Sequence, residues 1–325
     1  MLLGFDIGGT KCAVILGTTD ENGGLQIVQK EVLPTNKPAY QMIELLFNTA
    51  EALLQKQGFS STALQGIGIS CGGPLNSKRG LILSPPNLPG WDNIPIVQMT
   101  KERFNKNALL QNDANACAVA EWKYGAGKGF NNIIFLTFGT GMGAGLILDG
   151  RLYSGTSDLA GEVGHLRLAD IGPVGFGKLG SFEGFCSGGG IAQLAQMKVR
   201  ASLQMGEQVS FCNSLDDLPN ITARIVAEAA YNGDLVAIDI YKTCGFYLGK
   251  GLSLLIDLLN PELIILGSIY GRAKELIEPF MMQAIQKEAI YASYNACKIV
   301  PAGLSENIGD MAALSLAQLS YQDSL

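Results

Sequence analysis

Two stretches of this sequence share one pattern, in which an apolar strand runs through a glycine-rich turn directly into a second apolar strand. The first begins with "LLGFDIG" and continues through the turn "DIGGTK" into "KCAVILG". The second is "NIIFLTFGTGMGAGLILDG", at residues 132–150. Glycine-rich turns between apolar strands predict hairpins. The second hairpin follows the first after about 130 residues, which indicates two structurally related halves.

The rest of the chain alternates helical and strand patterns, which is typical of an α/β protein. Helices are expected over residues 40–57 and near 189–203, 220–231, 234–259, 271–287 and 309–320, and strands over "LQGIGIS", "ALLQN", "ELIILG" and "CKIVP". A helix is also expected to start directly after "ALLQN", at the polar junction "NDAN". The length of 325 residues allows two domains with well-buried cores.

Composition argues against several classes of protein. A net charge of -6 and a pI near 5.0 do not suit a surface that binds nucleic acid. The seven cysteines form no close pairs, which predicts buried thiols in a reducing compartment and hence a cytoplasmic location. The N-terminus lacks the features of a signal peptide. The most apolar long run is broken by Lys250, Asp257 and Pro261, so no contact with a membrane is expected.

Both glycine-rich turns are candidate phosphate sites, because backbone N–H groups can approach phosphate oxygens closely where no Cβ intervenes. The first turn adds the Thr10 hydroxyl and the Lys11 cation, and the second adds Thr140. Neither turn has the P-loop spacing, and a plain tight hairpin explains each one taken alone. Together they favour a nucleotide polyphosphate. Asp6, at the tip of the first strand, is a candidate to hold Mg²⁺ or its waters, or simply to cap the turn.

Two further stretches carry polar groups suited to catalysis or binding. Asn112 and Asp113 follow a strand and begin a helix, the usual place for a ligand in open α/β sheets, although a plain N-cap explains them equally well. A carboxylate there could take a proton from a substrate hydroxyl. His165 in "GEVGH" is the single histidine of the chain, and the nearest downstream cysteine, Cys186, stands alone. A zinc site needs three or four ligands, so substrate contact or a structural role is expected instead.

Six motifs in the same order make the chain resemble the ROK family of repressors, open reading frames and sugar kinases over essentially its whole length. They are "DIGGTK", "PPNLPGW", "NDAN", "GTGMGAG", "GEVGH" and "NPELIILGS". The resemblance implies an actin-like (hexokinase-like, ribonuclease H-like) two-domain α/β fold with a ligand cleft between the domains. It also implies a small domain of residues 1–112, completed by a C-terminal helix at 305–325, and a large domain of residues 113–304. A cytoplasmic homodimer that binds no nucleic acid is expected.

By resemblance, the activity is ATP-dependent phosphorylation of a hexose, with Mg²⁺ bound through the ATP phosphates and Asp113 as general base. Glucose is the expected substrate, giving glucose 6-phosphate. The sugar contacts implied are Gly73, Asn87, Asn112, Asp113, Glu162, His165 and Glu183. The nucleotide contacts implied are Asp6, Gly8, Gly9, Thr10, Lys11, Thr140, Gly141, Gly267 and Ser268, the last two on the adenosine side.

Two departures from the family pattern qualify this prediction. Val174, Phe176 and Ser181 stand where zinc-binding members carry cysteines, so a zinc-free loop held by apolar packing of Val174 and Phe176 is expected. In "ISCGGPLN", Gly72 replaces a proline common among the sugar kinases, which brings amino-sugar kinases into consideration.

Alternative functions remain open within the family. Other members phosphorylate N-acetylmannosamine, N-acetylglucosamine, fructose or allose, and a sugar sensor without catalysis would also bind a hexose. A DNA-binding repressor is not expected, because the first phosphate motif already starts at Asp6 and the chain is acidic. A Rossmann dehydrogenase is not expected either, because neither glycine motif lies between a strand and a helix.

The missing thiolates predict that the purified protein contains no zinc. Elemental analysis of untagged protein should find well below one zinc per chain, because no cysteine occupies the three family positions. Stoichiometric zinc that survives dialysis would show the prediction to be wrong.

Overall fold

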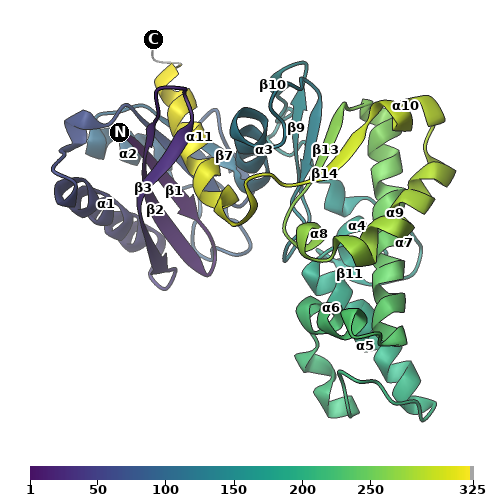
Figure 1. Cartoon of the computed structure of the whole chain (residues 1–325). Helices are drawn as coiled ribbons and strands as arrows, with labels where there is room; N and C mark the ends of the chain where they lie inside the picture. Colours follow the sequence, from purple (N-terminus) through teal and green to yellow (C-terminus); the bar gives the residue numbers. More distant parts are fainter. Residues whose placement is uncertain (323–325) are drawn as a thin grey trace. The chain divides into compact units, whose positions relative to one another are not determined.

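The computed structural model describes residues 1–322, and its mixture of helices and strands confirms the α/β class (Figure 1). The helices are α1 (Ala39–Lys56), α2 (Ile96–Phe104), α3 (Asp113–Tyr124), α4 (Phe182–Phe185), α5 (Gly188–Gln204), α6 (Ala223–Tyr231), α7 (Leu235–Leu259), α8 (Ile269–Arg272), α9 (Lys274–Glu288), α10 (Tyr291–Ala296) and α11 (Ile308–Gln322). The strands are β1 (Leu2–Ile7), β2 (Lys11–Thr19), β3 (Leu25–Pro34), β4 (Gly66–Cys71), β5 (Leu75–Asn76), β6 (Leu81–Ile82), β7 (Ala108–Asn112), β8 (Ile133–Leu136), β9 (Ala144–Leu148), β10 (Arg151–Leu152), β11 (Val174–Gly175), β12 (Lys178–Leu179), β13 (Leu263–Leu266) and β14 (Lys298–Pro301).

Most of the expected elements are confirmed, and two differ for local reasons. The helix expected near 271–287 is divided into α8 and α9 at Ala273, whose φ of -130° and ψ of 28° depart from helical values. The helix expected near 220–231 starts at Ala223, because a 3₁₀ turn containing Pro219 precedes it. Proline inside a helix removes one backbone donor, which favours such a short turn.

The chain forms two compact units. Unit 1 contains residues 1–129 and 145–160 and the C-terminal part from Gly303, and unit 2 contains residues 130–144 and 161–302. Residues 113–129 and 145–160 belong to unit 1. The division into a small and a large domain after residue 112 stays a prediction, because these compact units are defined by contacts alone. The last three residues of the expected helix 305–325 lie outside the described residues.

Unit 1 is built on a five-stranded sheet in the order β3-β2-β1-β4-β7. The first three strands pair antiparallel, as the expected hairpin requires, and β1, β4 and β7 run parallel. The register places Ile7 beside Cys71 and Cys71 beside Asn112. The carboxyl ends of the three parallel strands therefore meet at one edge of the sheet.

Alternate side chains of β1 pack into apolar cores on opposite faces of this sheet. Leu3, Phe5 and Ile7 face a core shared with α1 on one side, whereas Leu2 packs with Leu314 of α11 on the other. Figure 1 shows α11 in yellow lying along the purple strands. This approach is close, because a Cβ at Gly68 of β4 would lie 2.0 Å from the carbonyl oxygen of Ala313. The helix can lie this near only where the strand lacks side chains.

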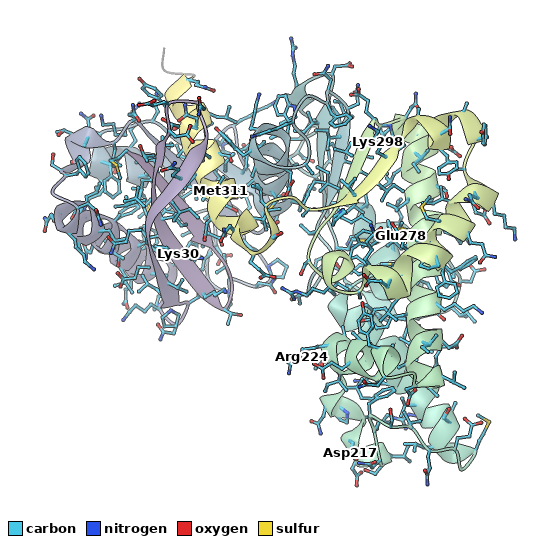
Figure 2. The ribbon with its side chains drawn as sticks, viewed as in Figure 1. Lys30, Asp217, Arg224, Glu278, Lys298 and Met311 are labelled. Atoms are coloured by element: carbon cyan, nitrogen blue, oxygen red, sulfur yellow. The ribbon has the colours of Figure 1, made fainter. Side chains whose placement is uncertain are left out.

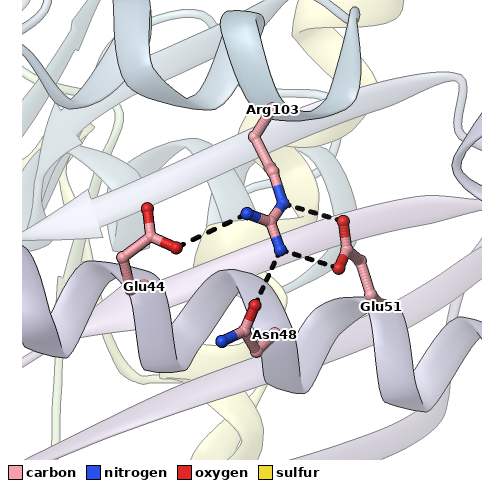
Figure 3. Close-up of polar contacts among 4 residues, drawn as sticks. All are labelled: Glu44, Asn48, Glu51 and Arg103. Atoms are coloured by element: carbon pink, nitrogen blue, oxygen red, sulfur yellow. Dashed lines mark hydrogen bonds and ion pairs between the residues drawn. The ribbon is translucent and has the colours of Figure 1, made fainter.

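Arg103 of α2 fastens that helix to α1 (Figure 3). Its Nε and one terminal nitrogen each donate to a carboxylate oxygen of Glu51 at 2.8 Å. The same guanidinium donates to Asn48 at 2.7 Å and approaches Glu44 at 3.4 Å. Hydrogen bonding to Arg103 lowers the pKa of Glu51. Because the group is exposed, this network fixes the geometry of α2 more than it adds stability.

Unit 2 contains the parallel strands β8, β13 and β14, with Leu263 of β13 beside Ile133 and Lys298. β9 and β10, almost all of whose residues belong to unit 1, pair antiparallel, with Arg151 beside Leu148. The 25-residue helix α7 packs along α9. Gly245 and Gly249 permit this contact, since a Cβ at Gly249 would lie 2.3 Å from the carbonyl oxygen of Met281. None of the helices within residues 1–322 is both long and apolar enough to cross a membrane.

A completely buried carboxylate, Glu121, holds together three segments of unit 1. Its oxygens accept hydrogen bonds from the backbone N–H groups of Ala126 (2.8 Å), Gly303 (3.1 Å) and Leu304 (2.8 Å). The carboxylate thus joins the end of α3 to the segment that leads into α11. Buried carboxylates are tolerated where several donors satisfy them in this way.

Replacing Glu121 with Ala should destabilise the protein by about 2–4 kcal/mol, because three backbone N–H groups lose their shared, buried acceptor. The free energy of unfolding in urea measures the change. Glu288→Ala, at an exposed position near the end of α9, is the matched control and should stay within about 0.5 kcal/mol of the parent. A Glu121→Ala variant as stable as the control would contradict this role.

Candidate functional site

The expected site residues of unit 1 gather at the carboxyl edge of its parallel strands. Asp6 is the next-to-last residue of β1, Gly73 follows β4 by two residues, and Asn112 ends β7. Strand register brings these positions side by side, since neighbouring strands lie about 4.8 Å apart. Parallel α/β sheets bind ligands at this kind of edge.

The first glycine-rich turn is a tight loop with an exposed outer side. Gly8 donates its N–H to the Lys11 carbonyl at 3.1 Å, and the Thr35 hydroxyl donates to the Gly8 carbonyl at 2.7 Å. Thr10 and Lys11 are exposed, so their polar groups are available to a ligand. A Cβ at Gly9 would lie 2.3 Å from the carbonyl oxygen of Asn87. The "PPNLPGW" loop therefore lies directly against the turn, and only glycine fits there.

Asn112 and Asp113 form the junction between β7 and α3. The Asn112 side chain is the N-cap, because its Oδ1 accepts the N–H of Asn115 at 3.0 Å. The local capping role considered from the sequence is thus confirmed for Asn112, while its amide nitrogen points toward Gly73. Asp113 is the first residue of α3, and its Oδ1 accepts the N–H of Ala114 at 2.8 Å.

The Asp113 carboxyl combines two properties that a general base needs. Protein atoms crowd around it, and this desolvation raises its pKa above the ordinary value, although hydrogen bonds from backbone N–H groups act in the opposite direction. Asp113 nevertheless has a solvent-exposed surface. The crowding and the exposure are compatible, because a group surrounded on most sides can still be open to solvent on one. A raised pKa makes a carboxylate a better proton acceptor.

Asp6 lies in a cluster of charges drawn from five elements, β1, β2, β3, α3 and α11. Burial raises its pKa to about 6, and the negative charges of Asp113 and Asp310 add to the effect. Asp310, in the first turn of α11, is buried and forms an ion pair with Lys30 of β3 at 2.7 Å. Figure 2 labels Lys30 and, beside Asp310 in the chain, Met311. Sequence analysis missed both Lys30 and Asp310, because no local motif connects residues 280 positions apart.

In unit 2, the second glycine-rich turn is held from several sides. Gly143 donates its N–H to the Thr137 hydroxyl at 2.8 Å, and Gly188, at the start of α5, donates to the Gly139 carbonyl at 2.7 Å. Gly267 and Ile269 donate to the carbonyls of residues 136 and 138. The structure thus brings Gly267 and Ser268 next to the turn, and Ser268 has the uncommon φ of 41°. Thr140, at the tip, is exposed.

Glu183 connects this turn to the expected sugar contacts. Its Oε2 accepts the N–H of Met142 at 3.0 Å, and a Cβ at Gly141 would lie 2.8 Å from the same oxygen. The "GEVGH" segment lies on the same turn, since a Cβ at Gly164 would meet the Met142 carbonyl at 2.4 Å. Glu162 is exposed, whereas His165 and Glu183 are half-buried. In unit 2, the expected phosphate contacts and the expected sugar contacts therefore lie around the same turn.

The loop after His165 does not fit a zinc ion. Val174 and Phe176 are 43% and 67% exposed and carry no ligand atom, and the buried Ser181 hydroxyl caps α4 by accepting the Gly184 N–H at 3.1 Å. Among residues 1–322, no three His, Cys, Asp or Glu side chains come together as a metal would require. The absence of zinc itself stays a prediction. The expectation that apolar packing of Val174 and Phe176 holds the loop was wrong, because both side chains are exposed and hydrogen bonds between Gln193 and the Val174 backbone hold it instead.

Comparison with known proteins gives the family context of these residues. A family model described as "ROK family" matches residues 2–319. The glucokinase of Streptomyces coelicolor is 29% identical over 321 residues, 98% of each chain. The xylose repressor of Caldicellulosiruptor bescii is 27% identical over 287 residues, 87% of this chain and 70% of the repressor.

The solved structures include a ROK family glucokinase from Streptomyces griseus in complex with glucose and AMPPNP. It has a TM-score of 0.73 and 28% sequence identity, and the match covers 98% of this chain and 99% of that one. This likeness confirms the expected actin-like α/β fold.

The charge cluster predicts how Asp6 affects stability. Between about pH 4 and pH 6 the folded protein keeps a proton on Asp6 that the unfolded chain has released, so this group lowers stability as the pH rises. Asp6→Asn removes the charge and should raise the free energy of unfolding by about 2 kcal/mol near pH 7.5. The gain should shrink toward pH 4. Urea unfolding across this pH range, with the exposed Asp216→Asn as control, checks it; an equal gain at every pH would contradict the cause given.

Proposed function

The chain belongs to the ROK family, and we propose that it is an ATP-dependent kinase that phosphorylates a hexose hydroxyl, with glucose as the first candidate. The observation that carries this proposal is the Asp113 carboxyl, which has a raised pKa and an accessible surface at the edge of a parallel sheet. The glucokinase relatives support the choice of substrate class. Glucose 6-phosphate would be the product.

In this mechanism Asp113 accepts the proton of the attacking sugar hydroxyl as the oxygen bonds to the γ-phosphorus of ATP. The bond from that phosphorus to the β,γ-bridging oxygen breaks, and ADP leaves. Such a transfer depends on positioning and charge stabilisation more than on covalent catalysis. The hydrogen bond from the Ala114 N–H holds the carboxylate in one orientation, which serves the positioning directly.

Other residues would bind the sugar through its remaining hydroxyls. In unit 1 these are Asn112, through its amide nitrogen, and Asn87 and Gly73. In unit 2 they are Glu162, His165 and Glu183. Carboxylates and amides suit this task, because an analogue that lacks a hydroxyl leaves them unpaired. Since Glu183 also binds the Met142 N–H, the same carboxylate would hold the sugar and the phosphate turn in register.

The phosphates of ATP would meet the two glycine-rich turns, through Gly8, Gly9, Thr10 and Lys11 in unit 1 and Thr140 and Gly141 in unit 2. Gly267 and Ser268 would lie on the adenosine side. Mg²⁺ would neutralise the phosphate oxygens, and Asp6 would hold it or its waters, since the crowded acidic groups that raise its pKa favour a cation. The seven cysteines are all free and buried in the structure, which supports a place in the reducing cytoplasm.

A sugar-sensing regulator without catalysis is the second candidate, because the xylose repressor also matches most of this chain. The two functions differ in turnover. Coupled detection of ADP with glucose, mannose, fructose, allose, N-acetylglucosamine and N-acetylmannosamine should give hexose-dependent turnover for a kinase. Binding of one of these sugars without ADP release would favour the sensor.

Asp113→Asn should lower kcat by about 10²–10⁴ while the Kd of the sugar changes by only a few fold, because a general base acts mainly in the transition state. Steady-state kinetics and calorimetric titration measure the two effects. Asp92→Asn, on an exposed loop of the same unit, is the control. Normal turnover by Asp113→Asn would eliminate this residue as the base.

A further inference from the structure

A short hairpin, residues 173–181, follows the single histidine of the chain. It consists of β11 and β12, which pair through Val174 with Leu179 and Gly175 with Lys178. The hairpin returns to α4, whose N-cap is Ser181. Its two strands are only two residues long, so pairing between them gives little stability on its own.

Two side chains of this 173–181 hairpin contact His165 directly. The Lys178 ammonium donates to the His165 carbonyl at 2.6 Å and so fixes the backbone of that residue. The Phe176 ring meets the imidazole edge to face, with ring centroids 5.1 Å apart. Phe176 is otherwise 67% exposed, an unfavourable position for a large apolar ring. The contact with His165 is therefore its principal packing.

Gln193 of α5 anchors the hairpin to the body of unit 2. Its Oε1 accepts the Val174 N–H at 3.0 Å, and its Nε2 donates to the Val174 carbonyl at 2.8 Å. The Gln193 side-chain amide thus pairs with both the N–H and the carbonyl of Val174, as the backbone of a neighbouring strand would. On the opposite side, Arg167 donates to the Leu179 carbonyl at 2.8 Å. The hairpin is connected on one side to a long helix and on the other to the segment that carries His165.

We propose that the 173–181 hairpin is a metal-free clamp that positions the His165 imidazole for a ligand, with Gln193 as anchor and Lys178 and Phe176 as the contacts. These are positioning residues: none needs to touch the ligand. That the ligand is a hexose rests on the proposed function, whereas the clamp itself rests on the contacts above. Hydrogen bonds and one ring contact do here what a metal ion would do with the thiolates that this loop lacks.

His165 allows a direct test, because a chain with one histidine gives one assignable set of imidazole resonances. Untagged protein is compared by NMR with Phe176→Ala, Lys178→Met and Gln193→Met at one fixed pH. Phe176→Ala should shift the imidazole resonances by removing the ring current. Gln193→Met, which keeps the size of the side chain and loses both hydrogen bonds, should shift them in the same direction, because the hairpin is released. Gln196→Met, three residues further along α5, should leave them unchanged.

Glucose affinity provides the second measurement. Gln193→Met and Lys178→Met should raise the calorimetric Kd of glucose about fivefold or more, with the affinity for AMPPNP unchanged, while Gln196→Met matches the parent. Unchanged melting temperatures separate lost positioning from unfolding. Imidazole resonances that stay at the parent values in Gln193→Met would overturn the clamp. If the parent itself binds no hexose, the proposed function fails, and the NMR comparison still decides whether the clamp exists.

Discussion

The parallel pairing of β1, β4 and β7 is the constraint on which the site in unit 1 depends. Glycine follows β1 and β4 directly, β7 ends at Asn112, and the register of the strands brings these ends to one edge. Burial of the Asp6 carboxyl at that edge raises its pKa, and the negative charges of Asp113 and Asp310 raise it further, so Asp6 retains a proton at unusually high pH. The sheet tolerates this cost because buried apolar side chains on both of its faces hold the strands in place.

In unit 2, several hydrogen bonds hold the glycine-rich turn at residues 139–143 in one conformation. Glycines allow close approach but bring the largest loss of backbone entropy on folding. The 139–143 turn is accordingly held by Glu183 through Met142, by the start of α5 through Gly139 and by residues 267–269 through β8. Among these neighbours, Glu183, Gly267 and Ser268 are also expected ligand contacts. A ligand bound to any of them would therefore act on the turn as well.

The loop after His165 is held by hydrogen bonds that come from more than one element of unit 2. Three positions without thiolates leave no ligands for a metal. A glutamine on α5 and a lysine in the hairpin supply hydrogen bonds that lead from the body of the unit to the histidine. These bonds are individually weak, and the pairing of the two short strands adds little stability to them.

The sequence by itself determined the class of the fold, most helices and strands, the two glycine-rich turns and the positions of Asp113 and His165. Those features rest on local patterns: apolar periodicity, glycine in turns, and Asn or Asp where a helix begins. Only the tertiary structure decided that Lys30 pairs with Asp310 beside Asp6, that Glu183 binds Met142, and that Gln193 holds Val174. The reason is physical: a hydrogen bond between distant segments depends on packing, and neither partner carries a local mark of the other.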